Sequence, residues 1–299
     1  MTNTRSRLRL GSCPDSWGVW FPDDPSQTPW HRFLDELAEA GYQWVELGPH
    51  GYLPTDPARL RDEVDRRGLR VSGQAVFGAL HDPDRWEADL RDAHQVAELV
   101  TAMGAGHVVL LPADAGPNPP ELDAERWRIL VERTSELGRI LGEEHGVAAV
   151  FHPHADSHVG TQEQVERFLE DTDPSTVSLC LDTGHISYYD GDNVAIIRKY
   201  PERIGYVHLK QVDPAIVERV HKEGLSFAEA VRLGAMVEPP RGVPEMPPAL
   251  DALAGVDRDL FAIVEQDLYP CDPDTPKPIA IRTREYLGGC GLVSRPARG

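Results

Sequence analysis

In the second half of the chain, four short apolar segments in a row each end on a side chain that can bind a metal ion. They are His152 after VAAVF, Asp182 after VSLCL, His208 after IGYV and Glu265 after LFAIV. Their separations of 30, 26 and 57 residues each fit one strand followed by one helix, with the last unit enlarged by an insertion. If these segments are neighbouring parallel strands of a barrel, their carboxyl ends bring the four side chains to one rim.

Two imidazoles and two carboxylates are typical ligands of a borderline divalent ion. We expect one such ion, Mn²⁺ or Co²⁺ first, with Zn²⁺, Fe²⁺ and Mg²⁺ as alternatives. A single strand-end histidine or aspartate is more often structural, but four in succession favour a metal site. His154 lies two residues beyond His152, and alternation along a strand directs both side chains to one side, so either could be the first ligand.

Further polar residues follow the same segments. His185 comes three residues after Asp182 in DTGH, and Lys210 comes two residues after His208 in HLK. Because the pKa of histidine lies near neutrality, we expect His154 and His185 to transfer protons. Lys210 would stabilise negative charge or hold a substrate hydroxyl. Candidate substrate contacts are Glu46, Trp17 and His81, and for Glu46 and His81 a structural or solvated role is the alternative.

The elements that must position these residues alternate along the whole chain. Short apolar, β-branched segments are separated by longer amphipathic ones, the pattern of repeated βα units around a parallel sheet. We expect a (β/α)8 TIM barrel, α/β in class, occupying residues 1–299 as one domain. Its strands are predicted over 8–13, 43–47, 69–77, 107–112, 147–152, 177–182, 204–209 and 260–266.

The helices between these strands carry recognisable ends. In 29–41 an apolar stripe precedes Gly41, and in 56–68 Asp56 can cap the helix, Pro57 fits its first turn and Gly68 ends it. The unit at about 211–248 is longer, with two helical pieces followed by EPPRGVPEMPP. Such an insertion on the loop face of a barrel predicts a substrate lid or a subunit contact.

Composition excludes several classes of partner. A formal net charge of −19 disfavours nucleic acid and anionic membranes, so we expect neither. The four cysteines are scattered, and no secretory or membrane-spanning segment is visible, which together predict a cytoplasmic protein. A homodimer or homotetramer stays open, with Trp17, Trp20 and Phe21 near the first loop as pocket or dimer contacts.

The chain resembles the sugar phosphate isomerase/epimerase family of xylose isomerase-like barrels. Within it, the likeness is greatest to the inosose (2-keto-myo-inositol) dehydratases of inositol catabolism. It extends over nearly the whole chain and is carried by CPDSWGVWFPDD, AGYQWVELGPHGYLPTDP, FHPHADSHVGT, LDTGHISYYDGDN and YVHLKQVDP.

This resemblance implies a metal held by glutamate, aspartate, histidine and glutamate at the ends of strands five to eight. Asp182, His208 and Glu265 match the last three positions, whereas His152 stands where many relatives have glutamate. His185 matches the family's substrate-contacting histidine, and Lys210 lies near a cationic or polar substrate contact. The implied activity is dehydration of 2-keto-myo-inositol or a related keto-sugar through an enediolate.

Other activities fit the same sequence features. An isomerase or epimerase of an inosose or ketose would use the same fold and metal, as would a lyase acting on another keto-sugar. A metal nuclease of this scaffold is disfavoured by the acidic charge. A barrel that only binds a polyol is the alternative outside enzymes.

Overall fold

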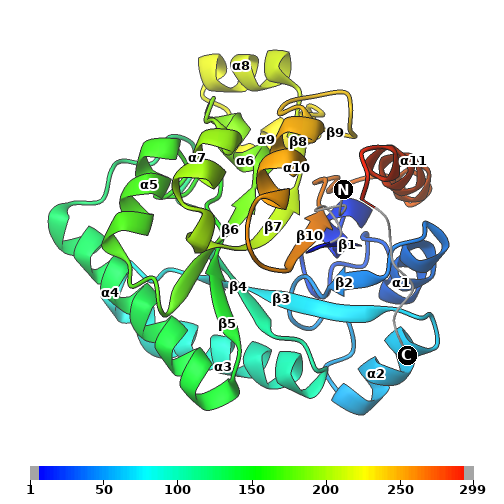
Figure 1. Cartoon of the computed structure of the whole chain (residues 1–299), viewed down its shortest axis with the longest axis horizontal. Coiled ribbons are helices and arrows are strands. Elements are labelled where there is room, and N and C mark those ends of the chain that lie inside the picture. Colours follow the sequence, from blue (N-terminus) through cyan, green and yellow to red (C-terminus); the bar gives the residue numbers. More distant parts are fainter. Residues whose placement is uncertain (1–6, 293–299) are drawn as a thin grey trace.

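Eight parallel strands close into a barrel in the order β1-β10-β7-β6-β5-β4-β3-β2, as Figure 1 shows. The computed structural model describes residues 7–292. All eight predicted strands are confirmed, and so is the TIM barrel. The barrel strands are β1 (Leu8–Ser12), β2 (Trp44–Glu46), β3 (Arg70–Gly78), β4 (His107–Pro112), β5 (Ala148–Phe151), β6 (Val177–Asp182), β7 (Ile204–Leu209) and β10 (Leu260–Val264).

Strand alternation decides which side chains reach the inside of the barrel. Along β6, Leu179 and Leu181 pack outward against the helices, whereas Cys180 packs inward with Tyr206 and other interior residues. Asp182 follows Cys180 by two positions and therefore emerges on the inner side at the carboxyl end of the strand. The same alternation places His208, two residues beyond Tyr206 on β7, at this end.

The helices form the outer layer. The helical assignments at 29–41 and 56–68 are confirmed: Gly41 and Gly68 adopt positive φ, and Asp56 accepts a hydrogen bond from the Arg59 amide. The helices are α1 (Trp30–Glu39), α2 (Pro57–Asp65), α3 (Trp86–Ala102), α4 (Ala124–Ile140), α5 (Gln162–Asp171), α6 (Thr183–Tyr188), α7 (Asn193–Lys199), α8 (Pro214–Glu223), α9 (Phe227–Arg232), α10 (Met246–Ala254) and α11 (Pro276–Gly289).

The long unit between β7 and β10 forms a small subdomain-like layer of its own. It contains α8, α9 and an antiparallel pair, β8 (Gln211–Val212) and β9 (Met236–Val237). Its apolar residues pack with Ala155 and Tyr188, which belong to the loops and helix that follow β5 and β6. In Figure 1 this yellow segment lies beyond the ends of β6 and β7. The insertion therefore covers part of the barrel's carboxyl end.

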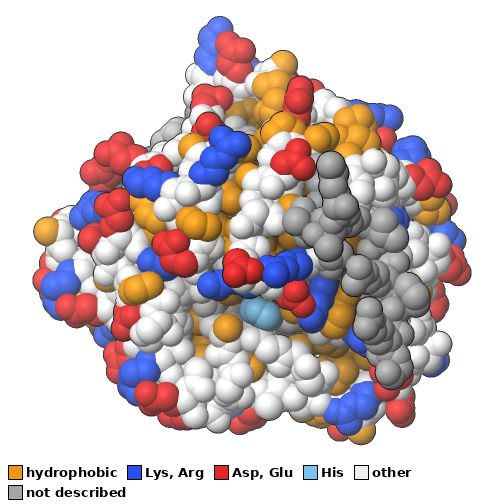
Figure 2. Space-filling view, viewed as in Figure 1, with side chains coloured by type: hydrophobic (Ala, Val, Ile, Leu, Met, Phe, Trp, Pro, Cys, Tyr) orange, Lys and Arg blue, Asp and Glu red, His pale blue; other side chains and the backbone are white. Residues whose placement is uncertain are grey.

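Charged side chains of both signs are interspersed on the face shown in Figure 2, and they do not form one continuous basic field there. Among residues 7–292, no helix combines the length and the apolar character needed to cross a membrane.

Candidate active site

The structure brings together four of the residues expected at the barrel rim. One ligand atom from each of His152, Asp182, His208 and Glu265 lies within 4.8 Å of the others, and all four side chains are buried. Of the two candidates for the first position, His152 belongs to this group and His154 does not.

Asp182 presents one carboxylate oxygen to this group because the other is already used. Its Oδ1 accepts hydrogen bonds from the amides of Gly184 (2.7 Å) and His185 (2.9 Å) and so caps helix α6. Its Oδ2 has no hydrogen bond within residues 7–292 and lies 3.3 Å from His152 Nε2. The capping role of Oδ1 thus fixes the direction of Oδ2, which points into the group.

His208 has its tautomer set by a carboxylate from across the barrel. Its Nε2 lies 2.8 Å from Glu46 Oε2, and because a carboxylate accepts, Nε2 carries the proton. Nδ1 is 2.5 Å from Glu265 Oε2, and although burial opposes the shift, the neighbouring Cys180, Glu265 and Glu46 raise the pKa of His208 well above its usual value, so a proton occupies Nδ1 until a metal replaces it. Two electron-rich atoms this close require a cation or a proton between them. A carboxylate behind a metal-binding histidine is the usual arrangement in metalloenzymes.

Lys210 lies beneath the site and neutralises only part of its charge. Its ammonium is 3.2 Å from Asp182 Oδ2, 2.6 Å from Glu265 Oε1 and 2.8 Å from Asp267 Oδ2. Burial alone would raise the pKa of both carboxyl groups. The charge of Lys210 outweighs burial, so the pKa of Asp182 lies below its usual value and the pKa of Glu265 lies well below its own. With Glu46, four buried carboxylates face one buried ammonium, an imbalance that a divalent cation would offset.

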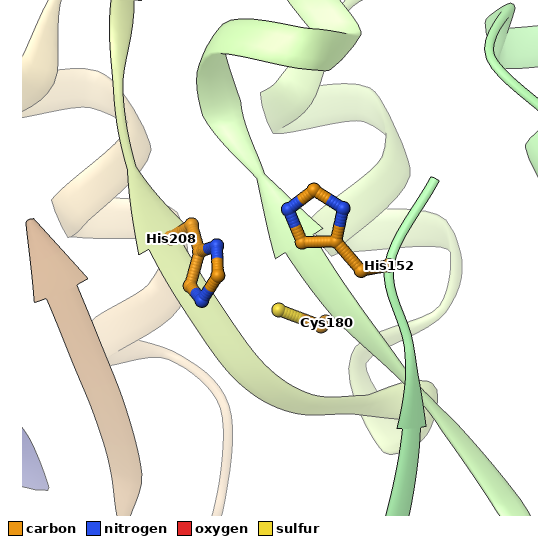
Figure 3. A group of neighbouring side chains, drawn as sticks. All are labelled: His152, Cys180 and His208. Carbon is orange, nitrogen blue, oxygen red and sulfur yellow. The ribbon is translucent and has the colours of Figure 1, made fainter. Parts of the chain in front are cut away.

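The donor atoms fit such a cation. In the part of the chain that the structure describes, His152 Nδ1 and Nε2, Asp182 Oδ2 and His208 Nδ1 are buried without a hydrogen-bond partner. Buried polar atoms of this kind are rare unless an ion or water satisfies them. Figure 3 shows Cys180 with His152 and His208, a second potential ligand set. Burial raises the pKa of Cys180 to about 11, so its thiol stays protonated and the carboxylates are the better ligands.

His154 lies beside the four residues and faces open space. Its Nδ1 is 2.7 Å from the Ala155 carbonyl oxygen, so Nδ1 donates and the lone pair lies on Nε2. Burial, with His152 and Lys210, lowers the pKa of His154 to about 3. The ring is therefore neutral near pH 7 and can accept a proton.

His185 lies under His154, with ring centroids 4.0 Å apart, and is itself buried. Its Nδ1 accepts a hydrogen bond from the Ala155 amide across 3.1 Å, so the one lone pair of its neutral ring is occupied. Its Nε2 lies 3.1 Å from Lys210 Nζ. Neither His185 nor Lys210 lines the adjoining cavity, so their placement differs from the substrate contacts expected for them.

A cavity of about 460 Å³ opens above the site, within the size range of small-molecule pockets. Its polar wall includes His154, His208, Glu265 and Glu46, and its apolar wall is largely aromatic. The aromatic residues are Trp20, Phe21, Phe77, Phe227 and Tyr269. Carboxylates suit sugar hydroxyls and aromatic rings suit the C–H faces of a sugar ring, so this lining fits a polyol.

Two residues expected at the substrate lie elsewhere. Trp17 is fully buried in the core, where it packs on Phe33 and donates its indole N–H to Glu36. His81 lines a separate, smaller cavity and contacts His158 at 4.7 Å between ring centroids. We correct both assignments for this reason. Glu46 does line the cavity, but it also holds His208.

Sequence reasoning missed several cavity residues, and Asp15 is one of them. Asp15, in the single turn Pro14–Trp17 after β1, lines the cavity with no side-chain hydrogen bond or ion pair to residues 7–292. Burial and the carboxylates of Glu265 and Asp267 raise the pKa of Asp15 well above its usual value. The signal available was Asp15 itself, a carboxylate just beyond the first strand.

Phe227 is another cavity residue that was missed, and it comes from the insertion. Its ring lies 4.9 Å from that of His154 and 5.0 Å from that of His185, measured between centroids. Its amide donates to Asp156 Oδ2 across 2.5 Å, which ties helix α9 to the loop after β5. The insertion thus contributes directly to the cavity wall over the histidines.

Comparison with known proteins identifies similar chains. The family model described as "Xylose isomerase-like TIM barrel" matches residues 34–281. A protein of Geobacillus kaustophilus named inosose dehydratase is 30% identical over 299 residues, which cover 96% of each chain. A protein of the same name from Geobacillus thermodenitrificans is 28% identical over 301 residues, covering 96% of this chain and 99% of the relative.

Among solved structures, the fold is similar to that of the IolI protein with a bound zinc atom. The TM-score is 0.72 at 16% sequence identity, and the match covers 95% of this chain and 98% of the IolI chain. At this identity the comparison establishes the shared barrel.

Proposed function

The chain belongs to the xylose isomerase-like TIM barrel family, and we propose that it is a metal-dependent hydro-lyase that dehydrates 2-keto-myo-inositol or a related keto-cyclitol. The observation that carries this proposal is the position of His154. A neutral histidine with a free Nε2 lies beside four converging metal-binding side chains, in one cavity of suitable size. The relatives named inosose dehydratase, aligned over nearly the full chain, support the same substrate class.

We propose His152, Asp182, His208 and Glu265 as the ligands of one divalent ion. When bound, such an ion polarises a ketone oxygen and acidifies the neighbouring C–H bond. The mixed nitrogen and oxygen donors suit a borderline divalent ion. We propose Mn²⁺ or Co²⁺, with Zn²⁺, Fe²⁺ and Mg²⁺ as alternatives. Lys210 and Glu46 are then positioning residues. Lys210 offsets the negative charge of the carboxylate ligands, and Glu46 orients His208 so that its Nδ1 faces the metal.

The two proton transfers of dehydration need a base and an acid. His154 Nε2 takes the proton from the carbon next to the ketone, and His185 supports its ring from below. The C–O bond at the next carbon breaks, and its electron pair leaves with the hydroxyl. Asp15, a cavity carboxyl with a raised pKa, gives that hydroxyl a proton, so water departs. The enol that is left tautomerises to a dione.

The insertion has a role in this proposal as part of the substrate enclosure. Phe227 packs against both histidines and makes the cavity wall beside them apolar. The hydrogen bond from its backbone amide to Asp156 Oδ2 holds this aromatic side chain in place. We further propose that the enzyme acts in the cytoplasm, as its scattered cysteines lead us to expect.

The experiment that tests this function follows ultraviolet absorbance after 2-keto-myo-inositol is mixed with protein loaded with Mn²⁺ or Co²⁺. A rising dione band that a chelator abolishes, and that added metal restores, is the expected result. No dione, together with altered stereochemistry or carbonyl position in the recovered sugar, would overturn dehydration and identify an isomerase or epimerase instead.

A further inference from the structure

A second group of metal-binding side chains lies in the outer helical layer, away from the cavity. It consists of His94 on α3 and of Glu144 and His145 in the π-helical turn Leu141–His145 that ends α4. One ligand atom from each lies within 4.8 Å of the other two. None of the three lines the proposed active-site cavity.

The two imidazoles already face each other through single nitrogens. His94 Nδ1 lies 2.7 Å from His145 Nε2, close enough for one ring to donate its proton to the other. Two nitrogens bound to one tetrahedral zinc ion lie about 3.3 Å apart, since each Zn–N bond is about 2.0–2.1 Å. A separation of the rings by roughly half an ångström, within reach of side-chain rotation, would therefore admit the ion.

The third ligand is available. The Glu144 carboxylate is exposed and forms no hydrogen bond or ion pair with residues 7–292, whereas the neighbouring Glu143 is paired with Arg139. Both histidines are partly buried, so a bound ion would be half enclosed, with room for water as a fourth ligand.

The backbone around this group is well fixed. The switch from α-helical to π-helical winding at Leu141 occurs one turn before Gly146, whose positive φ ends the helix. Thr101, on the same helix as His94, donates its hydroxyl to the His145 carbonyl oxygen across 3.2 Å. Such π-turns are frequent at functional sites. Here the turn places Glu144 and His145 against α3.

We propose that His94, Glu144 and His145 form a second divalent-metal site, selective for zinc, that fastens the end of α4 to α3. Two neutral imidazoles and one carboxylate suit Zn²⁺ better than Mg²⁺ or Ca²⁺. The proton shared by the two rings moves to an outer nitrogen when the ion binds. The site is structural and does not depend on the proposed dehydratase activity.

Zinc itself is the probe for the test. Protein stripped with a chelator is saturated with Zn²⁺ and desalted, and the zinc bound per chain is measured by mass spectrometry. Wild type should retain about one zinc more than His94→Ala or His145→Ala. His31→Ala is the matched control, because His31 is an exposed histidine on helix α1 outside every potential metal-binding group in residues 7–292, and it should behave as wild type.

A second readout separates metal binding from the loss of a side chain. Saturating zinc should raise the Tm of wild type by about 2–4 °C more than that of His94→Ala. The reason is that a ligand that binds only the folded protein shifts the folding equilibrium toward the folded state. Both measurements are differences between variants with an intact active site, so failure of the dehydratase proposal leaves them interpretable. Equal zinc content and equal zinc-dependent Tm shifts in wild type and both histidine variants would overturn the site.

Discussion

Glu46 and His208 are joined across the barrel by a 2.8 Å hydrogen bond that leaves Nδ1 of the histidine as its only metal-binding atom. Glu46→Gln should therefore lower metal affinity about 10-fold or more, the usual effect of losing a carboxylate behind a ligand histidine. Competition with a coloured chelator measures this. Glu36→Gln removes another buried carboxylate, one that accepts from Trp17 instead, and should leave affinity unchanged. Equal loss in both variants would contradict the orienting role.

His154→Asn tests the base. Asparagine can still donate to the Ala155 carbonyl oxygen as Nδ1 does, but it has nothing in place of Nε2. We expect kcat to fall by about 10²–10⁴-fold with metal content unchanged. The readout is turnover beside metal analysis of the same sample. Loss of metal in step with activity would show instead that His154 is a ligand.

Asp15→Asn tests the proposed general acid separately from the general base, His154. If Asp15 protonates the departing hydroxyl, the variant should lose water slowly while His154 still removes the neighbouring proton. In D₂O, nuclear magnetic resonance should then show deuterium entering the substrate faster than dione forms. Parallel loss of exchange and dehydration would argue that Asp15 acts earlier, in substrate binding.

The low pKa of His154 has a consequence for stability. Its pKa is about 3 in the folded protein against an ordinary 6.5, so between these values the unfolded chain binds a proton that the folded chain does not. This group therefore contributes a loss of stability as pH falls below 6.5, on the order of 1 kcal/mol by pH 5.5. Urea unfolding at pH 7.5 and 5.5 should show a smaller loss for His154→Asn. An identical pH dependence in the two proteins would be inconsistent with a depressed pKa.

Gly184 allows Lys210 to pass close to helix α6. A Cβ at this position would lie 2.7 Å from Lys210 Cβ, so Gly184→Ala must displace the lysine. We expect destabilisation of about 1–3 kcal/mol and loss of activity, because the ammonium no longer reaches its carboxylates. Gly289→Ala in α11 meets no atom within 4 Å and serves as the control in thermal unfolding. A fully active, stable Gly184→Ala protein would contradict this packing argument.

The sequence was sufficient for the barrel and for the positions where its strands stop. Side chains alternate between the two faces of a strand, so Asp182 points to the same inner side as Cys180, two residues before it. This placement can be predicted from the residue types along the strand. The choice between His152 and His154 could not be read, because β5 ends at Phe151 and strict alternation no longer applies beyond it. The alternation of apolar and polar residues does not predict the path of the chain after the strand ends.

Long-range packing decided the remaining positions. Trp17 and Trp20 are three residues apart in one aromatic segment, yet the turn at Pro14–Trp17 sends the first into the core and the second to the cavity. Phe227 reaches the histidines only because the insertion folds back over the barrel end. Neither outcome is encoded in local spacing.

The most direct test of the account is Glu265→Gln, with bound metal and 2-keto-myo-inositol turnover measured on the same preparation. Glu265 offers one oxygen to His208 Nδ1 and the other to Lys210, so the amide should weaken both contacts. The account predicts that metal content and dione formation fall together while the far-ultraviolet circular dichroism stays that of the wild type. Full metal content and full turnover in this variant would contradict the site.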